Sequence, residues 1–313
     1  MNKILTHLVT GGGGFIGSNL IDKLMEQGCK VICLDDFSIG RFVNIEKWIT
    51  HENFKLLNQD VKDPIDVKTD YIWHLACPAS PFNYQKDPIE TMKICFEGTL
   101  NILDLTHKLN AKLLFASSSE IYGVLNKMPL NEKHIGLVNT IGERSCYAEG
   151  KRICETLCNE FIKKYSLDIK IVRIFNTYGP KMYFKDKRVI GSFFESVLEK
   201  KDFIIYGDGT QTRSFCFIDD LIDIFIKIIY GSCHGPINIG SSEEITIIKL
   251  ANLIKDNYYP EGKLIFKDFR IDEPIKRRPS LDKVKALYGW EPKISLIEGL
   301  EKTYEYYLST QKL

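Results

Sequence analysis

Tyr147 and Lys151 stand four residues apart and could work together as a proton-transfer pair. A lysine ammonium beside a phenol lowers the pKa of the phenol, so that the tyrosine can take the proton of a sugar hydroxyl near neutral pH. Residues four apart on a helix share one face, as this chemistry requires. The same spacing recurs at two later places in the chain, Tyr183/Lys187 and Tyr259/Lys263.

The surrounding sequence favours Tyr147 and Lys151 over the two later pairs. They begin a segment, Tyr147–Tyr165, in which apolar residues recur at intervals of three and four, as on one face of a helix. The pair Tyr183/Lys187 follows Gly179-Pro180 in a charged stretch, and Pro260 and Gly262 lie between Tyr259 and Lys263, so neither pair promises a helical turn. We therefore expect Tyr147 to be the catalytic base and Lys151 its partner.

Three polar residues, Ser118, Ser119 and Glu120, come at the end of a strand predicted at Lys112–Ser118. At the carboxyl edge of a parallel sheet, their hydroxyls and carboxylate could contact the reacting sugar. Glu120 has a second interpretation, as a turn residue before Gly123. We expect the three residues to complete the catalytic group, with Glu120 as a proton-handling group near the sugar.

A glycine-rich segment after the first predicted strand, with Gly11, Gly14 and Gly17, is typical of a dinucleotide site. Glycine allows a tight turn and a close approach of the backbone to a pyrophosphate, whose charge the N-terminus of the next helix stabilises. Asp35 ends the second predicted strand, where a carboxylate can accept hydrogen bonds from the adenosine ribose. Because Asp35 would repel a 2′-phosphate, the sequence favours NAD over NADP.

Several neighbours are expected to line the same cofactor site. Asp36 is an alternative to Asp35 as the ribose-binding carboxylate. Asp60 and Val61 follow the third predicted strand and could border the adenine, although an aspartate at a strand end is often structural. The remaining cofactor contacts that we expect are Phe15, Ile16, Leu75 and Ala76.

The order of the predicted elements indicates an α/β fold, a Rossmann-type doubly wound parallel sheet. Strands are predicted at Ile4–Thr10, Lys30–Asp35, Phe54–Gln59, Tyr71–Ala76, Lys112–Ser118 and Ile169–Phe175, and helices at Phe15–Gln27, Pro88–Leu109 and Tyr147–Tyr165. After Tyr178 the elements become shorter. We expect an NAD-binding domain over residues 1–178 and a smaller C-terminal α/β substrate-binding region over 179–313, interleaved with the first.

Composition argues against several classes of partner. The 42 basic and 41 acidic residues nearly cancel, so no strong field favours nucleic acid or a membrane surface. Nine cysteines form no CxxC pair and six histidines form no HExxH motif, so we expect no bound metal and a reducing compartment. A strand predicted close to Met1 leaves no room for a signal peptide, and we expect a cytoplasmic protein.

Four blocks of sequence resemble the extended short-chain dehydrogenase/reductases and, within them, the UDP-glucuronate decarboxylases. The resemblance covers nearly the whole chain. Arg173–Pro180 and Tyr206–Phe215 are similar to nucleotide-sugar epimerases and dehydratases in general, whereas His74–Pro81 and Arg144–Arg152 resemble the decarboxylases. The resemblance implies NAD-dependent conversion of UDP-glucuronate to UDP-xylose through a 4-keto intermediate, with NAD regenerated.

The resemblance also implies roles for individual residues. Arg213 and Arg278 would hold the UDP portion, and a guanidinium is suited to this because its fork of donors can pair with a diphosphate. Proteins of this kind usually form homodimers through the helix after Pro88 and the helix that carries Tyr147. The substrate contacts implied in this way are Pro78, Ala79, Tyr84, Glu120, Arg144, Asn176, Val189, Tyr206, Arg213 and Arg278.

The chain departs from the decarboxylase pattern at two positions, and other activities stay open. Ala148 stands where the decarboxylases usually have aspartate, and Ser118 replaces their threonine. Ser119-Glu120 lacks the aspartate that a 4,6-dehydratase needs. A UDP-sugar 4-epimerase, and an oxidative decarboxylase that releases UDP-4-keto-pentose and NADH, remain alternatives. A non-enzymatic NAD-binding sensor or scaffold would not need Tyr147 and Lys151.

Overall fold

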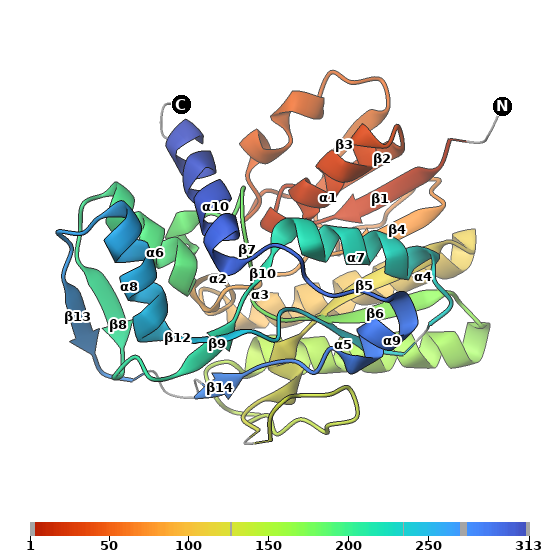
Figure 1. The fold of residues 1–313 in the computed structure, drawn as a ribbon. Helices are drawn as coiled ribbons and strands as arrows, with labels where there is room; N and C mark the ends of the chain where they lie inside the picture. The colour runs from red at the N-terminus through yellow and green to blue at the C-terminus, as the bar shows by residue number, and fades with distance from the viewer. Residues whose placement is uncertain (1–3, 126, 234, 270–273, 311–313) are drawn as a thin grey trace.

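The computed structural model describes residues 4–125, 127–233, 235–269 and 274–310. At its centre lies a parallel sheet of seven strands in the order β3-β2-β1-β4-β5-β6-β11, as Figure 1 shows. The strands are β1 Thr6–Thr10, β2 Lys30–Asp35, β3 Phe54–Asn58, β4 Tyr71–His74, β5 Lys112–Ser118, β6 Ile169–Ile174 and β11 Ile237–Ile239. The order reverses between β1 and β4, which is where α/β sheets form ligand crevices.

Both faces of this sheet are buried. Successive side chains of a strand point to opposite faces, so neighbouring apolar residues belong to different sides of the sheet. Leu8 and Val9 of β1 belong to different apolar clusters, as do Leu113 and Leu114 of β5. The strands are therefore apolar on both faces, which explains why they read in the sequence as continuous apolar runs.

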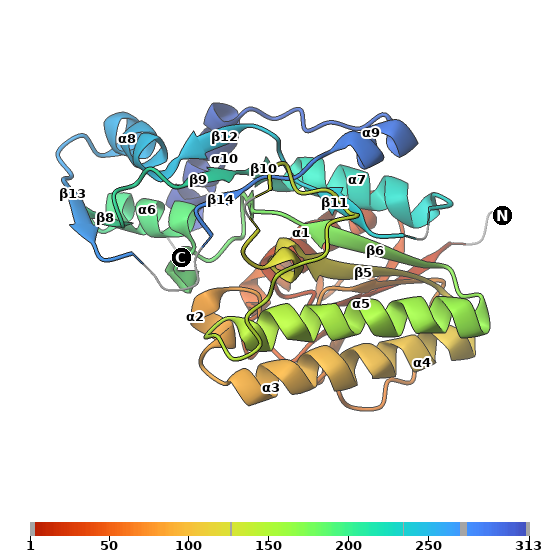
Figure 2. The ribbon, with the colours of Figure 1, turned by 90° about the horizontal axis from the view of Figure 1, so that it is seen from below.

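Helices cover the two faces of the sheet. Figure 2 shows α3 and α4 end to end with α5 beside them on one face, and α1 and α7 lie on the other. Their bounds are α1 Phe15–Glu26, α3 Pro88–Lys93, α4 Thr99–Leu109, α5 Ser145–Tyr165 and α7 Ile218–Tyr230. Within the described ranges, none of the helices combines the length and the apolarity needed to span a bilayer.

The predicted fold class is confirmed; several predicted elements differ by one or two residues at an end, and two larger differences appear. The predicted helix Pro88–Leu109 is three consecutive segments, because a π-helical turn at Ile94–Gly98 separates α3 from α4. The seventh strand, β11, was not predicted, since a run of three residues before Gly240 carries too little periodicity to be recognised.

The residues after Tyr178 add the strand β11 to the main sheet and the helix α7 to one of its faces. They also form a lobe beside the carboxyl edge of the sheet (Figure 1). The lobe and the adjoining segments comprise α6 Val189–Leu198, β8 Phe203–Tyr206, β9 Thr212–Ser214, β12 Glu244–Thr246, α8 Ile247–Tyr258, β13 Leu264–Lys267, β14 Lys276–Arg277 and α10 Leu296–Thr310. The remaining elements are α2 Pro81–Tyr84, β7 Thr177–Tyr178, β10 Cys216–Phe217, α9 Asp282–Tyr288 and short 3₁₀ turns at Phe42–Asn44, Glu46–Trp48, Ser119–Tyr122 and Phe184–Asp186.

Candidate active site

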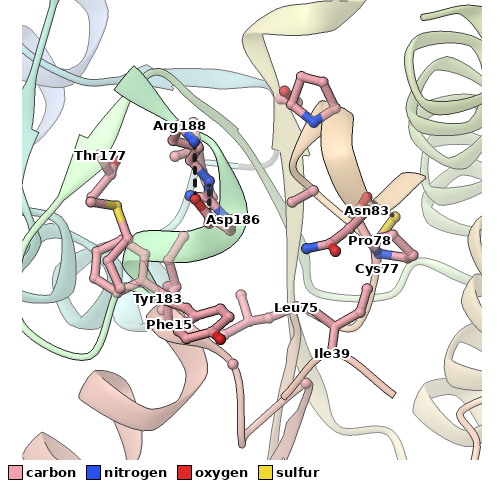
Figure 3. A pocket seen from close by; sticks show the side chains of 18 of the residues that line it. Phe15, Ile39, Leu75, Cys77, Pro78, Asn83, Thr177, Tyr183, Asp186 and Arg188 are labelled. Atoms are coloured by element: carbon pink, nitrogen blue, oxygen red, sulfur yellow. Dashed lines mark hydrogen bonds and ion pairs between the residues drawn. The ribbon is translucent and has the colours of Figure 1, made fainter. Parts of the chain in front are cut away.

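A cavity of about 420 Å³ opens between the carboxyl edge of the main sheet and the lobe. Figure 3 shows Cys77 and Pro78, which follow β4, on one side of it and Asp186 and Arg188, which precede α6, on the other. The glycine-rich loop after β1 and the start of α5 also line the cavity. The space therefore joins the expected cofactor site to the expected catalytic residues.

The glycine-rich loop needs glycine at two positions, because a Cβ there would come too close to the neighbouring backbone. Gly11 has a φ of +68°, and a Cβ there would lie 2.9 Å from the Cα of Ala76. A Cβ on Gly17 would collide with the carbonyl oxygen of Gly11, so only glycine lets α1 begin this close to the loop. Gly14 caps α1 without a side-chain hydrogen bond, and the first turn has no acidic residue. The N–H groups of this helix end are thus available to a pyrophosphate.

Asp35 and Asp36 have different surroundings, which separates the two candidate ribose ligands. Asp35 is 7% exposed and accepts hydrogen bonds from the backbone N–H groups of Gly13 and Phe37, each at 2.8 Å. Burial raises its pKa, while these hydrogen bonds act in the opposite direction. The Asp36 carboxylate instead accepts from Ser38 at the surface. Asp35 is therefore the carboxylate that faces the glycine-rich loop.

All the expected cofactor residues border the cavity. This set is Gly11, Gly14, Phe15, Ile16, Gly17, Asp35, Asp36, Asp60, Val61, Leu75, Ala76, Tyr147 and Lys151. The Asp60 carboxylate accepts from the backbone of Lys62 and lies 3.3 Å from its ammonium. It thus combines a structural role at the loop with a place on the cavity wall.

Tyr147 and Lys151 lie one turn apart at the start of α5, both buried in the cavity wall. The Lys151 ammonium donates to the Ala116 carbonyl at 2.8 Å and lies 5.8 Å from the centre of the Tyr147 ring. Burial raises the pKa of Tyr147 to about 12, against the lowering effects of the Lys151 charge and of a hydrogen bond with Ser118. The phenol is thus held beside the two groups that favour its ionised form.

Lys151 remains charged despite its burial. Burial lowers the pKa of this ammonium, but the neighbouring Cys77 and Tyr147 outweigh that effect, and its pKa is raised overall. The ammonium can therefore stabilise a developing phenolate throughout the physiological pH range.

The serines at the end of β5 have hydroxyls with different partners. Ser117 also borders the cavity, but its hydroxyl donates to the Glu155 carboxylate, which also binds Arg173 at 2.7 Å. The Ser118 hydroxyl accepts from the backbone N–H of Glu120 at 3.2 Å. Ser118 and Ser119 line the cavity.

Glu120 lies between two guanidinium groups. Arg144 binds its Oε1 at 2.7 Å, and Arg277 forms an ion pair with the same oxygen. Burial would raise the pKa of Glu120, but the two cations lower it to about 2. Glu120 is therefore an ionised group at neutral pH and not a proton donor in this arrangement.

The structure corrects the assignment of Arg278. Arg277, which the sequence reasoning missed, lines the cavity, while Arg278 lies outside its lining and pairs with Glu244 at 3.3 Å. Arg277 is in register with Arg213 on the neighbouring strand β9, and successive residues point to opposite sides. Lys276 to Arg278 is a run of basic residues, so only the strand pairing could decide which of them faces inward.

Tyr84, like Arg278, lies outside the cavity lining, whereas the remaining residues implied by the resemblance border it. It is 1% exposed at the end of α2, and its ring packs behind the ring of Tyr147. The expected substrate contacts that do line the cavity are Pro78, Ala79, Glu120, Arg144, Asn176, Val189, Tyr206 and Arg213. Arg213 donates to the carbonyl of Thr212 at 2.8 Å and is 8% exposed.

Ala148 borders a second, small pocket behind the Glu120 carboxylate. The side chain is 3% exposed, and Arg144 and Arg277 line the same pocket. An aspartate at this position would therefore place a second carboxylate near the two cations that hold Glu120.

Comparisons with known proteins agree with this geometry. A family model described as "NAD dependent epimerase/dehydratase family" matches residues 7–240. The chain is 44% identical over 300 residues to UDP-glucuronic acid decarboxylase 1 of Danio rerio, covering 96% of this chain and 72% of that protein. It is 44% identical over 294 residues to UDP-glucuronic acid decarboxylase 6 of Arabidopsis thaliana, covering 94% and 86%.

A solved structure shows the same fold with both ligands bound. UDP-glucuronic acid 4-epimerase from Bacillus cereus, in complex with UDP-glucuronic acid and NAD, superposes with a TM-score of 0.88 at 26% identity. The match covers 98% of this chain and 100% of that one. Given the family match over residues 7–240, the glycine-rich loop and the Tyr147–Lys151 pair in one cavity, the chain belongs to the NAD dependent epimerase/dehydratase family.

Proposed function

We propose that this enzyme uses NAD to convert UDP-glucuronate to UDP-xylose and carbon dioxide, regenerating NAD in each turnover. One observation carries the proposal. A single cavity, bordered by the glycine-rich loop, holds both the catalytic base Tyr147 with its partner Lys151 and the ion-paired group Arg144–Glu120–Arg277. The relatives named UDP-glucuronic acid decarboxylase support this choice of reaction.

The first step needs a base and a charge partner, which the chain supplies. NAD, when bound, would accept the hydride from C4 of the sugar and would later return it to the same carbon. Tyr147 takes the proton of the C4 hydroxyl, and the Lys151 ammonium stabilises the phenolate that acts as the base. The Ser118 hydroxyl, which hydrogen-bonds Tyr147, orients the reacting hydroxyl.

The second step follows from the chemistry of the oxidised sugar. A ketone at C4 is β to the C5 carboxylate, so the C5–carboxylate bond breaks with its electron pair held as an enolate. Carbon dioxide leaves, a proton from solvent is added at C5, and the 4-keto pentose is reduced at C4 by the returning hydride while Tyr147 gives its proton back to the C4 oxygen. The guanidinium groups of Arg144 and Arg277 provide positive charge beside the anionic sugar, and ionised Glu120 holds both in place.

A 4-epimerase is the second candidate, favoured by the fold match to UDP-glucuronic acid 4-epimerase. Both reactions begin with oxidation at C4, so Tyr147 and Lys151 have the same role in each. The two reactions differ in whether the C5–carboxylate bond breaks. An oxidative decarboxylase differs from both because it would release the 4-keto pentose and NADH.

A single incubation separates these candidates. The purified protein is mixed with UDP-glucuronate and an equimolar amount of NAD, while carbon dioxide, absorbance of NADH and the sugar product by NMR are followed. Carbon dioxide with UDP-xylose and no accumulating NADH is the expected result. UDP-galacturonate without carbon dioxide would establish the epimerase instead. Tyr147→Phe serves as the control, because it keeps the cavity but removes the base.

We also propose a homodimer that pairs through α3 and α5. Large apolar side chains on the outer side of these helices and the turn after α3 support it, since Ile89 is 71%, Met92 49%, Phe96 39% and Ile153 45% exposed. Figure 2 shows α3 and α5 adjacent at the edge of the molecule. A cytoplasmic location is likewise a proposal, supported by nine cysteines that all carry free thiols.

A further inference from the structure

We propose that Cys77 and Cys95 form a thiol–disulfide site in the wall of the cavity, which reacts with small disulfides and closes to a Cys77–Cys95 bond. Cys77 follows β4 and lines the cavity, as Figure 3 shows. Cys95 belongs to the π-helical turn Ile94–Gly98. The two sulfur atoms lie 3.3 Å apart, although the residues are separated by 18 positions in the chain.

The geometry requires little movement for the bond to form. A disulfide has a sulfur–sulfur distance of about 2.05 Å, so the two atoms must approach by roughly 1.2 Å more. The Cys95 sulfur is held on its other side by α5, where it faces Gly150, and a Cβ on that glycine would lie 2.8 Å from it. The pair is thus positioned by packing between two elements rather than by chance contact of surface side chains.

The two thiols differ in accessibility, which gives them different roles. Cys77 is partly exposed to the cavity, whereas Cys95 is 2% exposed. A hydrogen bond from Cys95 lowers the pKa of Cys77 to about 7, against the effect of burial and with help from the Lys151 ammonium. The pKa of Cys95 is raised, first by its hydrogen bonds to Cys154 and Cys77. Cys77 is therefore the attacking thiol and Cys95 the resolving one.

The reaction balances with a small disulfide as the oxidant. The Cys77 thiolate attacks one sulfur of the reagent, which gives a mixed disulfide and releases one thiolate. Cys95 loses its proton to the released thiolate and attacks the Cys77 sulfur, which expels the second half of the reagent as a thiolate. The two protein thiols are oxidised to one disulfide, and the reagent is reduced to two thiols.

Closure of this bond acts on the cofactor site through a short path. Cys77 lies one residue after Ala76, whose Cα is in contact range of Gly11 in the glycine-rich loop. The Cys77 sulfur also neighbours Lys151, because each shifts the pKa of the other. Drawing the sulfur towards Cys95 therefore displaces a loop that borders both the dinucleotide and the catalytic lysine. We expect loss of NAD affinity and activity that dithiothreitol restores.

The test uses cystamine on the purified full-length protein, followed by a non-reduced digest and mass spectrometry. The expected product is a peptide joined through Cys77 and Cys95, with a mass about 2 Da below the sum of the two peptides because two hydrogen atoms are lost. Bound NAD together with UDP is expected to slow its formation, since both occupy the cavity. This readout does not depend on which sugar the enzyme converts.

Serine variants distinguish the reactions of Cys77 and Cys95 from those of the other cysteines. Cys95→Ser is expected to retain a cystamine adduct on Cys77, and Cys77→Ser to leave Cys95 unmodified. Cys233→Ser and Cys29→Ser are matched controls, because these two thiols are partly exposed outside the cavity lining, and both variants should still form the Cys77–Cys95 peptide.

Two outcomes would overturn the proposal. Labelling of Cys29 and Cys233 with no joined peptide would mean that the cavity thiol is inert. A peptide joined through Cys95 and Cys154 would mean that Cys95 reacts with its other neighbour, whose sulfur donates to the Cys95 carbonyl at 3.0 Å. If Cys95→Ser does not fold by circular dichroism, Cys95→Ala replaces it, and the wild-type digest decides the pairing in either case.

Discussion

The ring of Tyr84 lies parallel to the ring of Tyr147, with the centroids 5.1 Å apart and the planes inclined by 4°. Tyr84 ends the short helix α2 and does not line the cavity. Its hydroxyl is buried and has no hydrogen-bond partner within the described part of the chain. The stack therefore fixes the plane of the catalytic phenol from behind, which makes Tyr84 a positioning residue.

Replacing Tyr84 tests this role. Tyr84→Phe keeps the stack and removes a buried hydroxyl without a partner, so we expect activity within about threefold of wild type and unfolding free energy unchanged or raised by about 1 kcal/mol. Tyr84→Ala removes the stack, and we expect kcat to fall roughly 10- to 100-fold with little change in KM. Steady-state kinetics and urea denaturation measure both effects. A raised KM in Tyr84→Phe would show instead that the hydroxyl binds substrate.

Lys151 is predicted to control the pH dependence through Tyr147. The base is the phenolate, so activity rises with pH as Tyr147 ionises; burial raises the pKa of Tyr147, and the Lys151 charge opposes that rise. Lys151→Met removes that charge, and we expect the ascending limb of the kcat profile to move to higher pH, with at least a tenfold loss at pH 7. An unshifted limb in the variant would contradict the pairing. Tyr147→Phe should lose the limb altogether.

Arg277 and Arg278 provide a matched pair of adjacent arginines. Arg277→Met removes one of the two cations that bind Glu120, and we expect kcat/KM to fall by about 100-fold because a buried charge loses one of its partners. Arg278→Met removes only the ion pair with Glu244, and the Arg278 side chain is 34% exposed. We therefore expect kcat/KM to change by less than about threefold. Equal losses in the two variants would mean that both arginines reach the substrate.

Glu120 is predicted to link stability to acid pH. Its pKa is 4.5 in the unfolded chain and about 2 in the folded one, because Arg277 and Arg144 outweigh burial. A lowered folded pKa stabilises the protein fully above pH 4.5, and that contribution is lost as pH falls towards 2. We expect Glu120→Gln to be less stable at pH 7 and to show a flatter loss of unfolding free energy between pH 5 and pH 2. Chemical denaturation across this range measures the difference.

The proposed dimer makes a prediction about α3 and α5. Ile89→Glu and Ile153→Glu place a charge on the exposed apolar side chains of these helices, and we expect the dimer to dissociate in sedimentation velocity. Ile297→Glu is the control, because this isoleucine is 58% exposed on α10, away from both helices. A monomeric wild-type protein, or an Ile89→Glu variant that remains dimeric, would rule out this interface.

The sequence by itself determined the local parts of this protein. Six strands of the main sheet were predictable, because strands buried on both faces are continuous apolar runs between turn residues. The cofactor loop was predictable for a different local reason, since glycine at positions 11 and 17 is required by close contacts within the loop and with the residues that follow β4. Tyr147 and Lys151 were recognisable because one helix fixes their relative position.

Only the tertiary structure decided which side chains converge from distant segments. Arg277 pairs with Glu120 across 157 positions, and the choice between it and Arg278 depends on the register of β14 with β9. A strand of two residues has no periodicity from which that register could be inferred. Cys77 and Cys95 likewise meet only because the π-helical turn packs beside the loop after β4. Local spacing specifies neighbours on one element, whereas contacts between elements depend on how the whole chain packs.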